Sequence, residues 1–134
     1  MPIRTLLDSG VLITAHRGER SDKKKALAIL QDPDRTLLTS PFLYFEIVRK
    51  AVYFKRDSEL AFYDVYFTDP SVEWYRELQA IHDLALQEAE RFGLAAMDAF
   101  HVAAASLLRA DELITIERPE KAIHRSSMVR VVRL

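Results

Sequence analysis

Hydrophobic positions along the chain follow two periods, which predict strands alternating with helices. Short apolar runs predict buried strands over residues 3–7, 35–39 and 112–116, and alternation over 128–134 predicts a terminal edge strand. Apolar residues at helical spacing predict helices over residues 22–30, 42–55, 58–67, 78–92 and 98–109. Residues 72–75 fit either a short strand or the opening of the next helix. This order is typical of an α/β fold, a three-layer α/β/α sandwich with a mostly parallel central sheet.

Several predicted helices carry boundary signals of their own. Ser40 and Pro41 form a helix start, with the serine as N-cap and the proline at the first helical position. Ser21 or Asp22 is the expected N-cap of the helix over 22–30. Gly93 directly follows the helix over 78–92, where glycine commonly ends a helix.

Composition and charge limit the kinds of binding site and the cellular location that we expect for this chain. A chain of 134 residues suits one domain, here residues 1–134, and 49% hydrophobic residues are ordinary for a globular protein. The net charge of -1 gives no global signal for a polyanion, so RNA or DNA binding would need a local patch or a metal. The absence of cysteine excludes disulfides and thiolate zinc sites. No apolar run reaches membrane-spanning length and no signal-peptide pattern is found, so we expect a cytoplasmic protein.

Four acids occupy matching places in the predicted fold. Asp8 and Glu117 each follow a predicted strand, Glu46 lies just inside a helix, and Asp98 starts another. Ligands collect at the carboxyl ends of parallel strands, where these acids would meet. Four carboxylates brought together need a cation, and carboxylates are hard ligands suited to Mg²⁺ or Mn²⁺. The pattern therefore predicts a divalent-metal site, provided that the four acids converge.

Each acid also has a purely structural interpretation. Asp8 can cap the helix that follows it, and Asp98 can cap its own helix. Glu46 can pair with the cations three and four residues later, and Glu117 can be a solvated loop acid. The metal prediction therefore rests on the set of four and not on any single member.

Four residues near the acids in sequence also bear on the predicted site, and two of them, Ser9 and Thr115, are assigned to it. Ser9 could orient a water or cap a turn, and Thr115 could contact substrate or water, or serve only the sheet. Gly10 allows close approach of the backbone. His101 lies three residues after Asp98 and can share its helix face, although a structural role is favoured over metal binding.

The ordered motifs resemble a PIN domain, most closely the small single-domain VapC-type toxin ribonucleases. The resemblance covers nearly the whole chain, and its motifs lie at residues 6–13, 39–46, 93–105 and 113–117. Each motif is degenerate alone, whereas the ordered set is specific. Two positions depart from the family pattern: Glu117 stands where an aspartate is frequent, and Gly10 stands where an asparagine is common.

The resemblance implies a metal-dependent endoribonuclease that hydrolyses RNA phosphodiesters, leaving 5′-phosphate and 3′-hydroxyl ends. Asp8, Glu46 and Asp98 match the core acids that bind Mg²⁺ or Mn²⁺, and Glu117 is a fourth catalytic candidate. One or two such ions would activate the attacking water and neutralise charge on the phosphate.

The same resemblance implies an RNA substrate, a homodimer and a small antitoxin partner. Arg49 and Lys50, close to Glu46 in sequence, are the phosphate-binding candidates, whereas Lys23–Lys25 favours a solvated helix face. An aromatic-rich stretch over residues 42–67, with Phe62 and Tyr63 as test positions, exceeds the obvious needs of one core. We expect part of it to form a dimer or antitoxin groove.

Two other functions compete with the ribonuclease. One is a catalytically weak PIN-fold module that binds nucleic acid or protein. The other is a phosphotransfer enzyme or phosphatase with Asp8 as nucleophile, but that chemistry usually needs a second aspartate close after the first, and residues 9–12 contain none.

Overall fold

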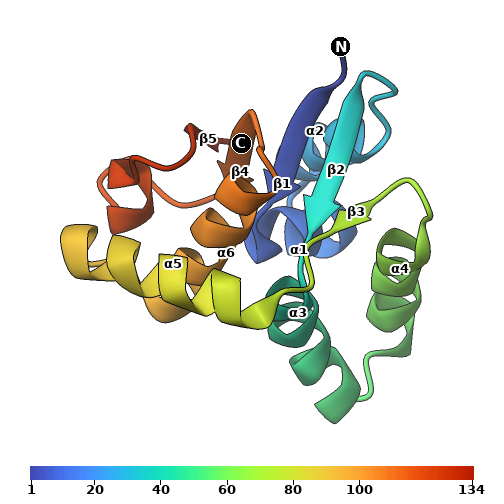
Figure 1. Cartoon of the computed structure of the whole chain (residues 1–134). Coiled ribbons are helices and arrows are strands. Elements are labelled where there is room, and N and C mark those ends of the chain that lie inside the picture. The colour runs from blue at the N-terminus through green and yellow to red at the C-terminus, as the bar shows by residue number, and fades with distance from the viewer.

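The computed structural model describes residues 1–134 and consists of a five-stranded sheet with six α-helices and one 3₁₀-helix (Figure 1). The elements in chain order are β1 (Ile3–Leu7), α1 (Ser9–Arg17), α2 (Arg20–Leu30), β2 (Arg35–Thr39), α3 (Pro41–Tyr53), α4 (Asp57–Thr68), β3 (Glu73–Trp74), α5 (Leu78–Phe92), α6 (Ala96–Leu107), β4 (Glu112–Thr115), η1 (Ala122–Arg125) and β5 (Val131–Arg133).

The strands are ordered β3-β2-β1-β4-β5, and all four pairings are parallel. β1 lies at the centre, with Leu6 opposite Leu38 of β2 and Leu7 opposite Ile114 of β4. β5 is an edge strand, as its short alternating sequence predicted. Residues 73–74 form the opposite edge because they pair with the end of β2, which resolves the segment that the sequence left open.

Alternate side chains of the strands enter two separate cores. Leu7 of β1 and Ile114 of β4 face a core completed by α1, α2, α3 and α4. Leu6 and Leu113 face the other side, where they pack with α5, α6 and η1. This two-sided burial confirms the predicted three-layer α/β/α sandwich and explains why the strands lack polar alternation.

Helix α3 lies at the carboxyl ends of the strands, below the arrowhead of β2 in Figure 1. Its buried residues Leu43 and Ile47 belong to the first core, whereas Phe42 packs against the second. The Phe42 ring stacks on Phe100 of α6, with centroids 4.2 Å apart and planes inclined by 10°. The stack joins α3 to α6 at the edge where the predicted site residues lie.

The predicted helix boundaries are partly right. Gly93 ends α5 in the left-handed conformation (φ 69°), as predicted. Ser40 is the N-cap of α3, but its buried hydroxyl makes no hydrogen bond. The N-cap of α2 is Glu19, so the prediction of Ser21 or Asp22 was wrong. None of the helices combines the length and apolar character needed to span a bilayer.

Candidate metal centre

Asp8 is a buried carboxylate held from both sides at the end of β1. Its backbone N–H continues the pairing with β4 by donating to the Ile114 carbonyl at 2.9 Å. Its Oδ1 accepts the N–H of Ser9 at 2.8 Å, and its Oδ2 accepts the hydroxyl of Thr115 at 2.9 Å. The side chain therefore caps α1 and also has a fixed orientation at the carboxyl edge of the sheet, so both interpretations of Asp8 fit the structure.

His101 of α6 lies close to both Glu46 of α3 and Asp8 at the end of β1. Its Nε2 lies 2.9 Å from Oε1 of Glu46 and 3.9 Å from Oδ1 of Asp8. One ligand atom from each of these three residues lies within 4.8 Å of the other two. His101 is fully buried and was absent from the predicted site set, although its spacing of three residues from Asp98 was the available signal.

The His101–Glu46 contact has the electrostatics of an ion pair. Burial lowers the pKa of His101, but the hydrogen bond to Glu46 and the charges of Asp8, Glu46 and Asp98 raise it overall. Burial raises the pKa of Glu46, but the hydrogen bond and charge of His101, helped by Ser9 and Arg49, lower it overall. The carboxylates around His101 thus favour its protonated, cationic form.

Asp98 shares this environment without being the N-cap of its helix. The N-cap of α6 is Ala95, so Asp98 lies inside the first turn, and the capping interpretation is wrong. Burial and the charge of Asp8 raise the pKa of Asp98 to about 6, with further contributions from Glu117 and Glu46 and an opposing one from His101. The four predicted acids therefore interact, and their charge exceeds what His101 neutralises.

Glu117 lies at the rim of the cluster. Its backbone N–H donates to the Thr115 hydroxyl at 3.1 Å, which links the loop after β4 to the residue that holds Asp8. Its side chain is half-buried and is not one of the three closest donors. The closest donors are thus those of Asp8, Glu46 and His101, whereas Asp98 and Glu117 interact with this group through their charges.

A family model described as PIN domain matches residues 5–118. The chain belongs to the PIN domain family. No curated protein sequence matches it significantly.

Several solved structures share the fold of this PIN domain at low sequence identity. A structure of VapBC2 from Rickettsia felis bound to a DNA fragment from their promoter has a TM-score of 0.72, 13% identity, and coverage of 98% of this chain and 99% of that one. A toxin–antitoxin complex from Klebsiella pneumoniae has a TM-score of 0.62, 21% identity, and coverage of 87% and 88%. FitAcB from Neisseria gonorrhoeae has a TM-score of 0.62, 16% identity, and coverage of 96% of both chains. At these identities the likeness concerns the fold.

Gly10 of this PIN domain sits directly beneath the loop that follows β4. A Cβ atom at this position would lie 2.6 Å from Cγ1 of Ile116, well inside contact distance. The predicted close approach at Gly10 is therefore present. Any larger residue here, including the asparagine common in the family pattern, requires Ile116 to move.

Arg49 and Lys50 line a pocket of about 220 Å³ that also contains Ser9 and Glu46. Both cations are exposed, and the charge of Arg49 contributes to the lowered pKa of Glu46. They therefore lie beside the carboxylate cluster, and their binding of phosphate stays a prediction.

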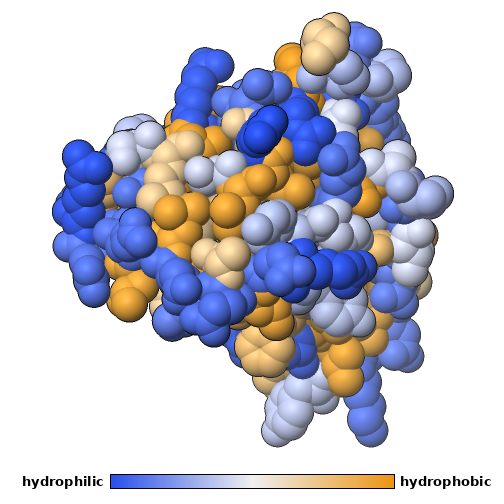
Figure 2. Space-filling model, in the orientation of Figure 1, coloured by the Kyte–Doolittle hydropathy of each residue, from blue (hydrophilic) through white to orange (hydrophobic).

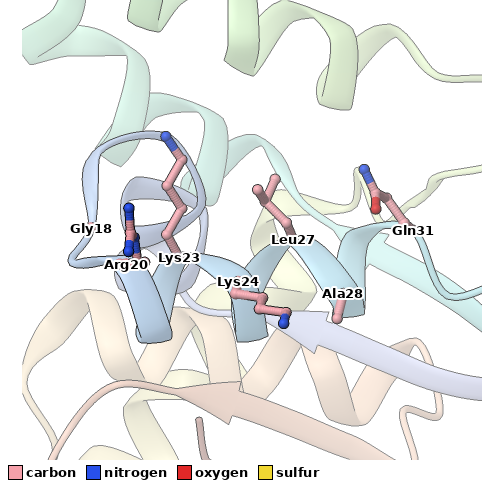
Figure 3. A pocket seen from close by; sticks show the side chains of 7 residues that line it. All are labelled: Gly18, Arg20, Lys23, Lys24, Leu27, Ala28 and Gln31. Atoms are coloured by element: carbon pink, nitrogen blue, oxygen red, sulfur yellow. The ribbon is translucent and has the colours of Figure 1, made fainter.

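The basic run of α2 lies in a different hollow. Figure 3 shows Arg20, Lys23 and Lys24 on the surface of α2, around a hollow of about 670 Å³ that none of the four acids lines. This position fits the predicted solvated helix face.

The aromatic-rich stretch divides between core and surface. Tyr63 is 0% exposed and lies in the core, so it is unavailable to a partner, and its choice as an interface test position was wrong. Phe62 is half-buried beside a surface pocket between α2 and α4. Phe45, Tyr53 and Phe54 of α3 and its C-cap are exposed, and Figure 2 shows apolar residues at the lower end of the molecule, where α3 lies.

Proposed function

We propose that this PIN domain is a metal-dependent endoribonuclease that uses Mg²⁺ or Mn²⁺. The observation that carries the proposal is the cluster of Asp8, Glu46 and His101 at one edge of the sheet, beside Asp98, whose pKa is raised by burial and by the charge of Asp8. Such an excess of buried negative charge favours a divalent cation. The donor set fits, because carboxylate oxygens suit both metals.

In this proposal Asp8, Glu46 and Asp98 hold the metal, and Glu117 assists from the rim. When bound, the metal supplies positive charge for the phosphate and makes the attacking water more acidic. Thr115 keeps Asp8 in one orientation through its hydrogen bond, and His101 does the same for Glu46. Ser9, next to both Asp8 and Glu46, orients substrate or water, and Arg49 and Lys50 bind phosphate groups of the RNA.

We further propose that the chain is the toxin of a toxin–antitoxin pair. Support comes from the fold, which is shared with proteins solved as VapBC2 and as a toxin–antitoxin complex. The proposal implies a cytoplasmic homodimer that a small antitoxin inhibits. The exposed residues Phe45, Tyr53 and Phe54 and the pocket beside Phe62 are the surfaces available for these two contacts.

The test of the nuclease is cleavage of a panel of single-stranded and structured RNAs by the purified chain. Reactions contain Mg²⁺, Mn²⁺ or EDTA, and Asp98→Asn is compared with Asp64→Asn, the same change at an exposed position of α4. We expect cleavage that requires metal, is lost in Asp98→Asn and is retained in Asp64→Asn.

Cleavage that persists in EDTA would contradict the proposed chemistry. RNA binding without metal binding or cleavage would instead favour the catalytically weak binding module. Mn²⁺ affinity, measured by calorimetry on the same proteins, separates these outcomes because it does not depend on finding the right RNA.

A further inference from the structure

The pocket beside Glu46 holds more cations than the site so far described uses. Arg17 at the end of α1 and Arg56 at the N-cap of α4 line it together with Arg49 and Lys50 of α3. The lining thus contains four cations but only two carboxylates, Glu46 and Glu59. Even with both carboxylates ionised, the pocket lining carries more positive than negative charge.

Glu59 is a buried carboxylate that faces both Arg17 and Arg56. It is only 6% exposed and accepts the hydroxyl of Tyr63 at 2.6 Å. Nε of Arg17 lies 3.7 Å from one of its oxygens, and Nη1 of Arg56 lies 3.9 Å from the other. Both separations exceed hydrogen-bond length, so the two guanidinium groups are attracted to Glu59 without forming a hydrogen bond to it.

A tight turn after α3 fixes the position of the Arg56 backbone. Lys55 adopts the left-handed conformation (φ 53°), which is uncommon for a residue with a side chain. The N–H of Lys55 donates to the Val52 carbonyl and that of Arg56 to the Ala51 carbonyl, closing a tight turn after α3. This turn brings Arg56 back towards the pocket that α3 itself lines.

We propose that Arg17 and Arg56 bind a backbone phosphate of the RNA next to the one at the metal centre, with Glu59 as the residue that positions them. This inference rests on the proposed ribonuclease function. Guanidinium groups suit phosphate because their planar donors match its oxygens. A chain of net charge -1 has no general attraction for RNA, so this concentration of cations beside the acidic cluster is where the backbone is held.

Glu59 has a role here that simple charge counting would not predict. Removing a negative charge from the pocket should by itself strengthen RNA binding. If Glu59 positions the two arginines, Glu59→Gln weakens RNA binding instead, although the variant is more positive. Glutamine can still accept the Tyr63 hydroxyl, so the substitution preserves the buried hydrogen bond.

The test measures binding of a fluorescently labelled single-stranded RNA in EDTA over a range of salt concentrations, so that neither metal nor cleavage contributes. Arg17→Ala and Arg56→Ala are compared with Arg91→Ala, which removes the same charge from an exposed position on α5. We expect several-fold weaker binding for each pocket variant and a salt slope smaller by about 0.7 for each lost phosphate contact. Arg91→Ala should leave both quantities unchanged.

Equal affinity and salt slope in wild type, Arg17→Ala and Arg56→Ala would overturn the inference, as would tighter binding by Glu59→Gln. The outcome is separable from the proposed function. Metal-dependent cleavage with unchanged salt slopes refutes only the phosphate site, whereas pocket-dependent binding without any cleavage supports the site and refutes the nuclease. Absence of both binding and cleavage refutes both.

Discussion

His101 of α6 holds Glu46 of α3 through a contact of 2.9 Å between residues that lie 55 positions apart in the chain. The imidazole is fully buried, and its pKa is raised because Glu46, Asp8 and Asp98 surround it with negative charge. His101 thus serves as an internal counter-ion for the acids, and its loss should be visible in the stability of the protein itself.

We expect His101→Gln to destabilise the EDTA-treated protein by about 1 to 3 kcal/mol at pH 6, because the carboxylates lose their cation. A raised pKa means that this stabilisation is complete below the unfolded-state value near 6.5 and is lost as pH rises through the folded-state value. The destabilisation should therefore shrink at alkaline pH. Urea unfolding at several pH values measures it, with His82→Gln on the exposed face of α5 as control. A pH-independent loss would point to packing alone.

Thr115 determines the orientation of Asp8 through a buried hydroxyl 2.9 Å from Oδ2. Thr115→Val keeps the shape but leaves this carboxylate oxygen without its partner, which should cost about 1 to 3 kcal/mol of stability. We also expect weaker Mn²⁺ binding, measured by calorimetry, because the ligand is no longer held in place. Thr115→Ser retains the hydroxyl and should behave much more like wild type; equal effects of the two variants would exclude the hydrogen bond as the cause.

Asp98 should impose a stability cost in the absence of metal. Its pKa is raised to about 6, so the folded state favours the protonated form, and stability falls as pH rises from about 4 to about 6. Asp98→Asn should therefore stabilise the EDTA-treated protein at pH 8, by about 1 to 2 kcal/mol after allowance for solvent screening. Little change is expected at pH 4. Unfolding in urea at both pH values tests this, and a destabilised variant at pH 8 would show that the acids do not repel one another.

Gly10 and Ile116 should be energetically coupled. A Cβ at residue 10 would lie 2.6 Å from Cγ1 of Ile116, so Gly10→Ala should change the stability of the wild type little, because the cost of moving the exposed Ile116 side chain offsets the gain in helix propensity. In an Ile116→Ala background the clash is absent, and the same change should stabilise by about 0.5 kcal/mol because alanine favours the helix. A double-mutant cycle by urea unfolding measures the difference, and simple additivity would contradict it.

Much of the architecture follows from local sequence. Apolar runs with side chains buried on both faces specify β1 and β4 as central strands, and Ser40-Pro41 and Gly93 mark helix ends that the structure contains. Because parallel strands end at one edge, the positions of Asp8 and Glu117 after strands already predicted their proximity. The segment at residues 73–74 was undecided because two residues carry no period, and only pairing with β2 makes them a strand.

The four candidate acids were named from the sequence, whereas their surroundings were decided by the tertiary structure. His101 has one local signal, its spacing from Asp98, but its partner Glu46 comes from another helix. The pocket of Arg17, Arg56 and Glu59 depends on α1, α3 and α4 packing together, which no periodicity encodes. Tyr63 likewise looked like an interface residue until packing buried it. The spacing of hydrophobic residues determines helices and strands through neighbours in the chain. Charge pairs and pockets form between elements that are distant in sequence, and only folding brings these together.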